Sequence, residues 1–124
     1  MLPLVASSLL LGCAPAEAGP ARVAADDFQA SVAARDWPSA CELLSEDART
    51  QLESTSARSC VQALPELELP RGTAADIQVW GHNATARVTG RALFLARFAD
   101  GWRVVAAGCE SRGDDRPYAC SVRG

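Results

Sequence analysis

The stretch ALFLARFADGWRVVAAG, residues 92–108, decides the fold of this chain. Two apolar runs are joined by Asp100-Gly101, a dipeptide that is typical of a tight turn between antiparallel strands. The sequence therefore predicts a β-hairpin with one strand over 92–98 and the other over 102–108. Both strands are apolar on both of their faces, and a sheet of that kind needs cover on both sides.

The loop length decides which residues of the hairpin share a face. With a two-residue loop, one face carries Phe94, Phe98, Val105 and Ala107, and the other carries Leu93, Leu95, Trp102, Val104 and Ala106. A three-residue loop with a bulge would regroup them without changing their apolar character. Helices can cover only one face, so the other must curl into a cone around its own cavity or meet a partner. This is the clearest hint of function in the sequence.

The residues around the hairpin extend the sheet. Runs 77–80 and 84–88 alternate apolar and polar residues, with a turn at 81–83 between them, and a last strand is expected over 118–122. Trp80 falls on the face opposite the aliphatic residues of its own run. Large aromatic residues of this sheet are therefore the candidates for ligand or partner contact: Trp80, Phe94, Phe98 and Trp102.

The first half of the chain has helical periodicity instead. One apolar face of a first helix is formed by Ala21, Ala25, Phe28 and Val32. Residues 36–38 end this helix, and Pro38 suits the first turn of the next one.

Serine caps predict two further helices. Ser45 is a good N-cap for a third helix, and Ser59 fits a capping box for a short fourth turn that ends at Pro65. Residues 65–73 are expected to form a loop. The predicted fold is therefore α+β, with N-terminal helices packed on a curved, cone-like antiparallel sheet of four to five strands. It is a single domain over 21–124.

An apolar stretch that begins at Leu2 closes on Leu10-Leu11-Gly12-Cys13. This pattern resembles the lipobox of bacterial lipoproteins, in which the cysteine is acylated and becomes the first mature residue. The resemblance implies a signal peptide over 1–12 and a flexible tether over 13–20. Fatty acyl chains on Cys13 would hold the protein at the extracytoplasmic face of the cell membrane. An apolar N-terminus without processing is the alternative.

Four further cysteines remain, and an even number in a small exported domain indicates disulfides. Three pairings are possible for four cysteines. We expect Cys41–Cys60 and Cys109–Cys120, because each pair joins neighbouring elements of the predicted layout. Zinc is the alternative, but the chain has no C-x-x-C pair and a single histidine, so no metal is expected.

Composition and motifs argue against several functions. The net charge of −3 disfavours nucleic-acid binding. No phosphate-binding loop or nucleophile motif is present, and no cofactor is expected. His82 in its turn and Asp114-Asp115 in a polar loop are interpreted as solvated residues. Asp26-Asp27 are interpreted as part of a solvated helix face.

Three stretches carry a family resemblance: ACELL at 40–44, GWRVVAAGC at 101–109 and PYAC at 117–120. Together they resemble small bacterial secreted lipoproteins of the nuclear transport factor two-like superfamily, which has a cystatin-like cone fold. The resemblance covers 21–124 and implies the fold and the location, but no activity. Some proteins with this cone are isomerases or dehydratases with a carboxylate inside it, and here Asp26 or Asp27 would be that group.

Three hypotheses follow from these observations. The first is a non-enzymatic, membrane-tethered module that binds a small apolar ligand or a protein partner. The second is a structural envelope component that self-associates as a homodimer through the sheet. The third, which we do not favour, is a cone-fold enzyme with Asp26 or Asp27 as its base.

Overall fold

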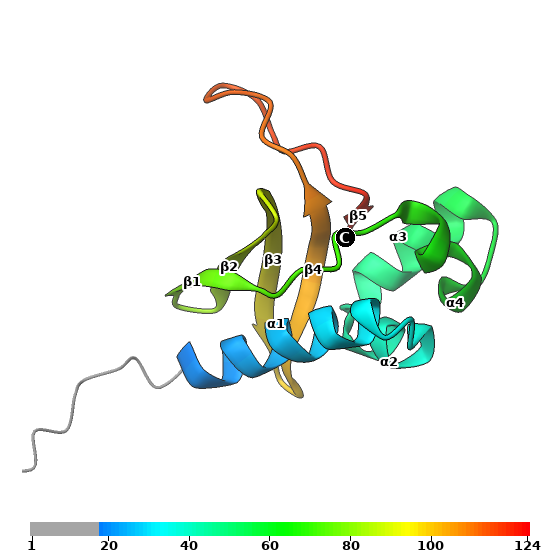
Figure 1. The fold of residues 1–124 in the computed structure, drawn as a ribbon, viewed down its shortest axis with the longest axis horizontal. Helices are drawn as coiled ribbons and strands as arrows, with labels where there is room; N and C mark the ends of the chain where they lie inside the picture. The colour runs from blue at the N-terminus through cyan, green and yellow to red at the C-terminus, as the bar shows by residue number, and fades with distance from the viewer. Residues whose placement is uncertain (1–17) are drawn as a thin grey trace, which may run out of the picture.

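The computed structural model describes residues 18–124, so the expected signal peptide and Cys13 lie outside the described residues. Helices precede strands along the chain (Figure 1). The helices are α1 (Ala18–Ala33), α2 (Trp37–Leu43), α3 (Glu46–Ser56), α4 (Cys60–Ala63) and the 3-10 helix η1 (Leu64–Leu67). The strands are β1 (Ala75–Trp80), β2 (Asn83–Val88), β3 (Arg91–Phe98), β4 (Gly101–Cys109) and β5 (Val122–Arg123). The predicted α+β class with N-terminal helices is confirmed.

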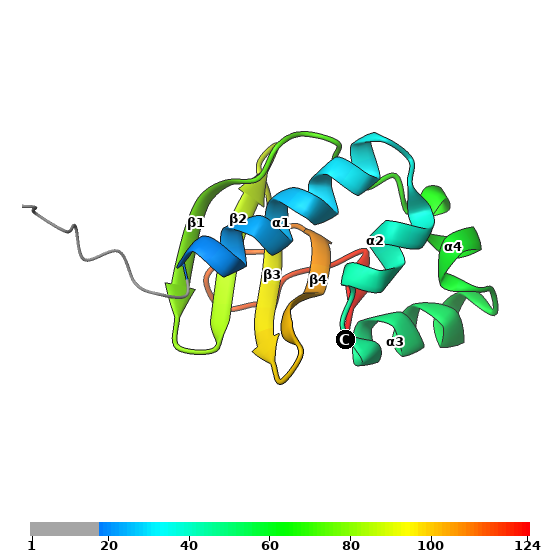
Figure 2. The same ribbon diagram turned by 90° about the horizontal axis from the view of Figure 1, so that it is seen from below.

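α1 lies across one face of the sheet, while the chain that follows β4 passes behind the strands (Figure 2). The apolar face predicted for α1 is fully buried and consists of Ala21, Ala25, Phe28 and Val32. The helix begins at Ala18, so residues 18–20 of the expected tether belong to its first turn. Pro20 is compatible with this position, because the first amides of a helix need no partner within the helix.

The predicted N-caps of α3 and α4 are confirmed. Ser45 accepts a hydrogen bond from the Ala48 amide at 3.1 Å, and Ser59 accepts one from the Gln62 amide at 3.4 Å. α4 ends at Ala63, before the expected end at Pro65, and the chain continues directly into η1, which contains Pro65. The first part of the expected 65–73 loop is therefore helical, since a proline in the first turn of a 3-10 helix removes no hydrogen bond.

The sheet is a simple antiparallel meander in the order β1-β2-β3-β4-β5. It is open: within residues 18–124, the edge strands β1 and β5 do not pair with each other. The last strand covers only Val122–Arg123 instead of the expected 118–122. Upstream of it, Ala119 pairs with Glu110 in an isolated bridge, so the two chain segments remain aligned.

Hydrogen bonds from the α2–α3 connection and from the C-terminal residue complete the outer edge of β4. The Ser45 amide donates to the Val104 carbonyl at 2.8 Å, and the Gly124 amide donates to the Val105 carbonyl at 2.9 Å. The connection before α3 and the last residues of the chain are thus bonded to the same strand. Helices α2 to α4 stand beside this edge of the sheet (Figure 2).

The register between β3 and β4 shifts twice, as shown by three pairs: Leu95 with Val104, Phe94 with Ala106, and Ala92 with Cys109. At each shift β4 contains one residue more than β3, so β4 carries two bulges. The second shift includes Gly108, whose φ of +63° favours glycine.

The bulges regroup the faces of the hairpin. The hairpin loop has two residues, 99 and 100, as the first alternative requires. That alternative nevertheless placed Ala106 and Ala107 on the wrong faces. Ala107 belongs to the main core between the sheet and the helices, whereas Ala106 packs on the opposite side. The extra residue in β4 reverses the alternation beyond Val104.

The sheet face opposite α1, called the open face below, has a small apolar cluster of its own. Its members are Ala92, Phe94, Ala106, Cys109, Tyr118 and Cys120. The last two come from the segment 110–121, which is joined to β4 by the predicted Cys109–Cys120 disulfide. The second cover that the apolar hairpin requires is thus supplied in part by this segment, and the sheet does not close on itself.

Candidate functional site

The open face carries a groove of about 460 Å³ between β1, β2, β3 and the segment 110–121. We call it the open-face groove. Its aromatic lining residues are Trp80, Phe94 and Tyr118. Its polar lining residues are Asp76, Gln78, Thr85 and Arg87. A groove of this size lies within the range of small-molecule sites.

The strand alternation explains why aromatic residues reach this groove. Ile77 and Val79 of β1 pack against the main core, so Trp80 points to the opposite side of the strand, as the sequence predicts. Its side chain is 57% exposed. An indole left uncovered on an otherwise ordered sheet offers a flat apolar surface to a ligand.

Phe94 and Tyr118 form the floor of the groove. Their ring centroids are 5.2 Å apart and the rings meet edge to face at 75°. Tyr118 lies two residues before Cys120, so the Cys109–Cys120 disulfide holds it against β3. The aromatic floor is therefore preorganised by a covalent link.

Pairing across the strands places the polar residues in rows. Gln78 pairs with Thr85, and Thr85 pairs with Phe94, so these three lie side by side across the sheet. Arg87 lies two residues further along β2 and pairs with Ala75, the residue before Asp76. The two charged side chains thus stand at the same end of the groove, and Trp80 stands at the other end.

Asp76 reaches the groove because β1 is irregular there. The register of β1 against β2 shifts between Ala75 and Gln78, and Asp76 has a left-handed φ of +52°. Aspartate tolerates this conformation better than most residues. Within the part of the chain that the structure describes, no salt bridge or side-chain hydrogen bond engages Asp76 or Arg87.

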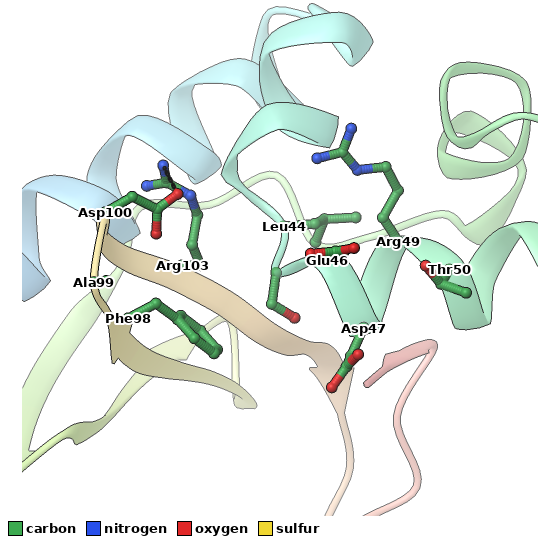
Figure 3. A pocket seen from close by; sticks show the side chains of 10 residues that line it. Leu44, Glu46, Asp47, Arg49, Thr50, Phe98, Ala99, Asp100 and Arg103 are labelled. Atoms are coloured by element: carbon green, nitrogen blue, oxygen red, sulfur yellow. Dashed lines mark hydrogen bonds and ion pairs between the residues drawn. The ribbon is translucent and has the colours of Figure 1, made fainter.

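A larger cleft of about 840 Å³ lies between the first turn of α3 and the β3–β4 hairpin (Figure 3). Several of its polar groups already serve the fold. Arg103 forms an ion pair with Asp100 at 3.2 Å, and Ser45 caps α3. We favour the open-face groove as the candidate site, although it is smaller, because it combines the exposed Trp80 with the Phe94–Tyr118 ring pair.

The structure separates the four aromatic candidates. Trp80 and Phe94 lie together in the open-face groove, whereas Phe98 lines the cleft beside α3. Trp102 is only 4% exposed and belongs to the main core. Trp102 also lines a cleft beside Phe98 and Pro20, away from the open-face groove, so its assignment as a contact residue stays a prediction.

The carboxylates proposed for the enzyme hypothesis do not face the interior. Asp26 and Asp27 are both exposed, since the buried face of α1 is occupied by Ala25 and Phe28. His82 is an exposed turn residue whose ring contacts Arg97, and Asp114-Asp115 are exposed in the segment 110–121. Among residues 18–124, no three metal-binding side chains gather into a cluster.

The sequence did not single out the polar residues of the groove. Asp76 and Arg87 resemble ordinary solvated residues. Tyr118 packs edge to face on Phe94, and the same ring also lines the groove. The alternation of β2 could have revealed two of these polar residues, because it places Thr85 and Arg87 on the same side of the sheet.

Comparison of the chain with protein-family models, curated proteins and solved structures finds no match. Across residues 18–124, every helix falls short of the length and apolar character needed to cross a bilayer.

Proposed function

We propose that this protein is a non-enzymatic binding module, tethered to the extracytoplasmic face of a bacterial membrane through lipidated Cys13, that holds a small ligand in the open-face groove. The N-terminal resemblance to a lipobox supports the tether. The resemblance of residues 21–124 to lipoproteins of the nuclear transport factor two-like superfamily supports the extracytoplasmic location and leaves the activity open.

The exposed indole of Trp80 beside the Phe94–Tyr118 pair is the observation that carries the proposal. A domain of this size normally packs its large aromatic rings into its core, as it does with Trp102. The groove instead combines an uncovered indole with a disulfide-held aromatic floor and a few polar groups. That combination is typical of small-molecule sites.

The test uses the full chain with Cys13→Ser, exported to an oxidising compartment and studied by native, non-reducing mass spectrometry. We expect a mass above that of the two-disulfide polypeptide that disappears on denaturation. In parallel, indole serves as an uncharged probe in NMR titrations, where we expect amide shifts confined to β1, β2 and the segment 110–121.

Trp80→Ala should abolish both signals because it removes the exposed ring. Phe98→Ala is the matched control, since Phe98 is 46% exposed but lines the other cleft. A bare monomer with no response to indole would contradict the proposal. A dimer that Trp80→Ala dissociates would instead support self-association through the sheet.

A further inference from the structure

The open-face groove has a charged end and an aromatic end, and this polarity identifies a class of ligand. Resting on the function proposed above, we propose that the groove binds a free zwitterionic α-amino acid with an aromatic side chain. The ligand's carboxylate meets Arg87, its ammonium meets Asp76, and its ring lies over Phe94 toward Trp80.

Two opposite charges of the protein are available at the charged end. Asp76 and Arg87 line the same groove, and within the described residues neither is engaged by another side chain. Arg87 is paired across β1 and β2 with Ala75, the neighbour of Asp76, so the two charged residues lie on adjacent strands at the same end of the groove. A guanidinium binds a carboxylate through parallel hydrogen bonds, and a carboxylate accepts hydrogen bonds from an ammonium group.

A ligand with a single charge fits this end poorly. An anion would approach Asp76 as well as Arg87, and a cation would approach Arg87 as well as Asp76. Asp76 and Arg87 are both exposed, so solvent screens part of the effect, but like charges brought together still repel each other. A zwitterionic head satisfies both protein groups at once and leaves no charge unpaired.

The spacing along β2 sets the length of the ligand. Arg87 lies two residues from Thr85, the partner of Phe94, and four residues from Asn83, the partner of Trp80. At about 3.3 Å per residue, the backbone of Arg87 is roughly 7 Å from the Phe94 row and roughly 13 Å from the Trp80 row. An aromatic amino acid spans the first distance, and a bicyclic ring extends toward the second.

Isothermal titration calorimetry with L-tryptophan tests the proposal on the full chain carrying Cys13→Ser. Three analogues dissect the ligand: tryptophanamide lacks the carboxylate, N-acetyl-L-tryptophan lacks the ammonium charge, and indole lacks the whole head. We expect each analogue to bind more weakly than L-tryptophan, by at least about tenfold for the loss of one charged hydrogen-bonding group.

Variants of the protein provide the matching half of the experiment. Arg87→Gln should weaken L-tryptophan about tenfold but should not weaken tryptophanamide, whose positive charge no longer meets that of Arg87. Asp76→Asn should weaken L-tryptophan similarly but should not weaken N-acetyl-L-tryptophan, whose negative charge no longer meets that of Asp76. Asparagine also tolerates the left-handed backbone of residue 76, so this variant keeps the bulge. Arg112→Gln and Asp114→Asn, both exposed in the segment 110–121, are controls that should change nothing.

The outcomes separate this inference from the function on which it rests. If indole binds as well as L-tryptophan, the groove is an aromatic site and the zwitterion inference is wrong, while the binding function stands. The inference is also wrong if Arg87→Gln weakens all four ligands equally. If neither L-tryptophan nor indole binds, both proposals fail.

Discussion

Gln29 is a polar residue on the buried face of α1, with only 5% of its surface exposed. Its amide nitrogen donates two hydrogen bonds, to the Pro70 carbonyl at 3.0 Å and to the Gly72 carbonyl at 2.8 Å. These bonds fix the connection that leads from the helices into β1. A single side chain thus holds together segments that are about forty residues apart.

Gln29→Ala should lower the free energy of unfolding by about 1–3 kcal/mol, because it leaves two partly buried carbonyls without their donor. Gln51→Ala on the exposed side of α3 is the control for the change in helix propensity, and we expect it to stay within about 0.5 kcal/mol of the parent. Urea denaturation followed by circular dichroism measures both. Equal stabilities for the two variants would show that the Gln29 bonds contribute nothing.

Those features of the fold that depend on residues close together in the sequence could be predicted from residue patterns. The buried face of α1 and the caps Ser45 and Ser59 follow from spacing over one or two turns, and the structure confirms them. The role of Gln29 could not be predicted, because its partners lie in a loop far along the chain. The sequence pattern of a helix does not distinguish a glutamine that is exposed to solvent from one that is hydrogen-bonded to a distant loop.

At the scale of elements, the segment 110–121 behaves as a strap on the open face. The Cys109–Cys120 disulfide and the Glu110–Ala119 bridge hold its two ends together, and Tyr118 packs on Phe94. The Cys41–Cys60 disulfide does a separate task, because it joins α2 to the start of α4. Both pairings agree with the prediction made from the order of the elements.

Replacing Cys109 and Cys120 together by alanine should lower the free energy of unfolding by about 2–3 kcal/mol through the greater freedom of the unfolded chain. Locally, we expect faster hydrogen exchange at the Glu110 and Ala119 amides, which donate to each other's carbonyls at 2.8 and 2.9 Å. Exchange within β2 should be unaffected. The paired Cys41→Ala and Cys60→Ala variant is the control, and unchanged protection at 110 and 119 without the Cys109–Cys120 bond would contradict the prediction.

Strand positions were predictable, but the faces of β4 were not. Period-two patterns and the Asp100-Gly101 turn are local signals, and they locate the hairpin correctly. The two bulges depend on which of two apolar faces each residue packs against, and both faces of β4 are apolar. Gly108 was the one local sign of the second bulge, because glycine within a strand often marks such a site.

At the scale of the whole molecule, the helical half and the sheet share one core and are joined by backbone bonds to β4. The sequence predicted that the apolar hairpin needs a second cover. It did not predict that the cover is partial and leaves a groove. Which residues line the groove depends on how β1, β2 and β3 are aligned, as for Arg87 and Asp76. This alignment is set by the strand register and cannot be deduced from one strand alone.

The proposed tether belongs to this same scale, because it would decide where the groove is presented. In a bacterial host, the parent chain should incorporate labelled palmitate at Cys13. It should also appear in the membrane fraction, because each CH₂ group of an acyl chain that enters the bilayer contributes about 0.8 kcal/mol to binding. Cys13→Ser should move the protein to the soluble exported fraction and abolish labelling. Replacing Cys109 and Cys120 instead should leave both unchanged, and a parent chain found in the soluble fraction would exclude the anchor.

The irregular β1 also governs how copies of this protein behave when they are crowded together. A strand at the rim of a sheet can template the addition of further strands, and growth of this kind ends in fibrils. Here the left-handed Asp76 interrupts the rim within its first residues and places a carboxylate there. Neighbouring copies can therefore collide often without one sheet extending into the next. The bend that brings a charge to the groove thus also guards the domain against polymerisation.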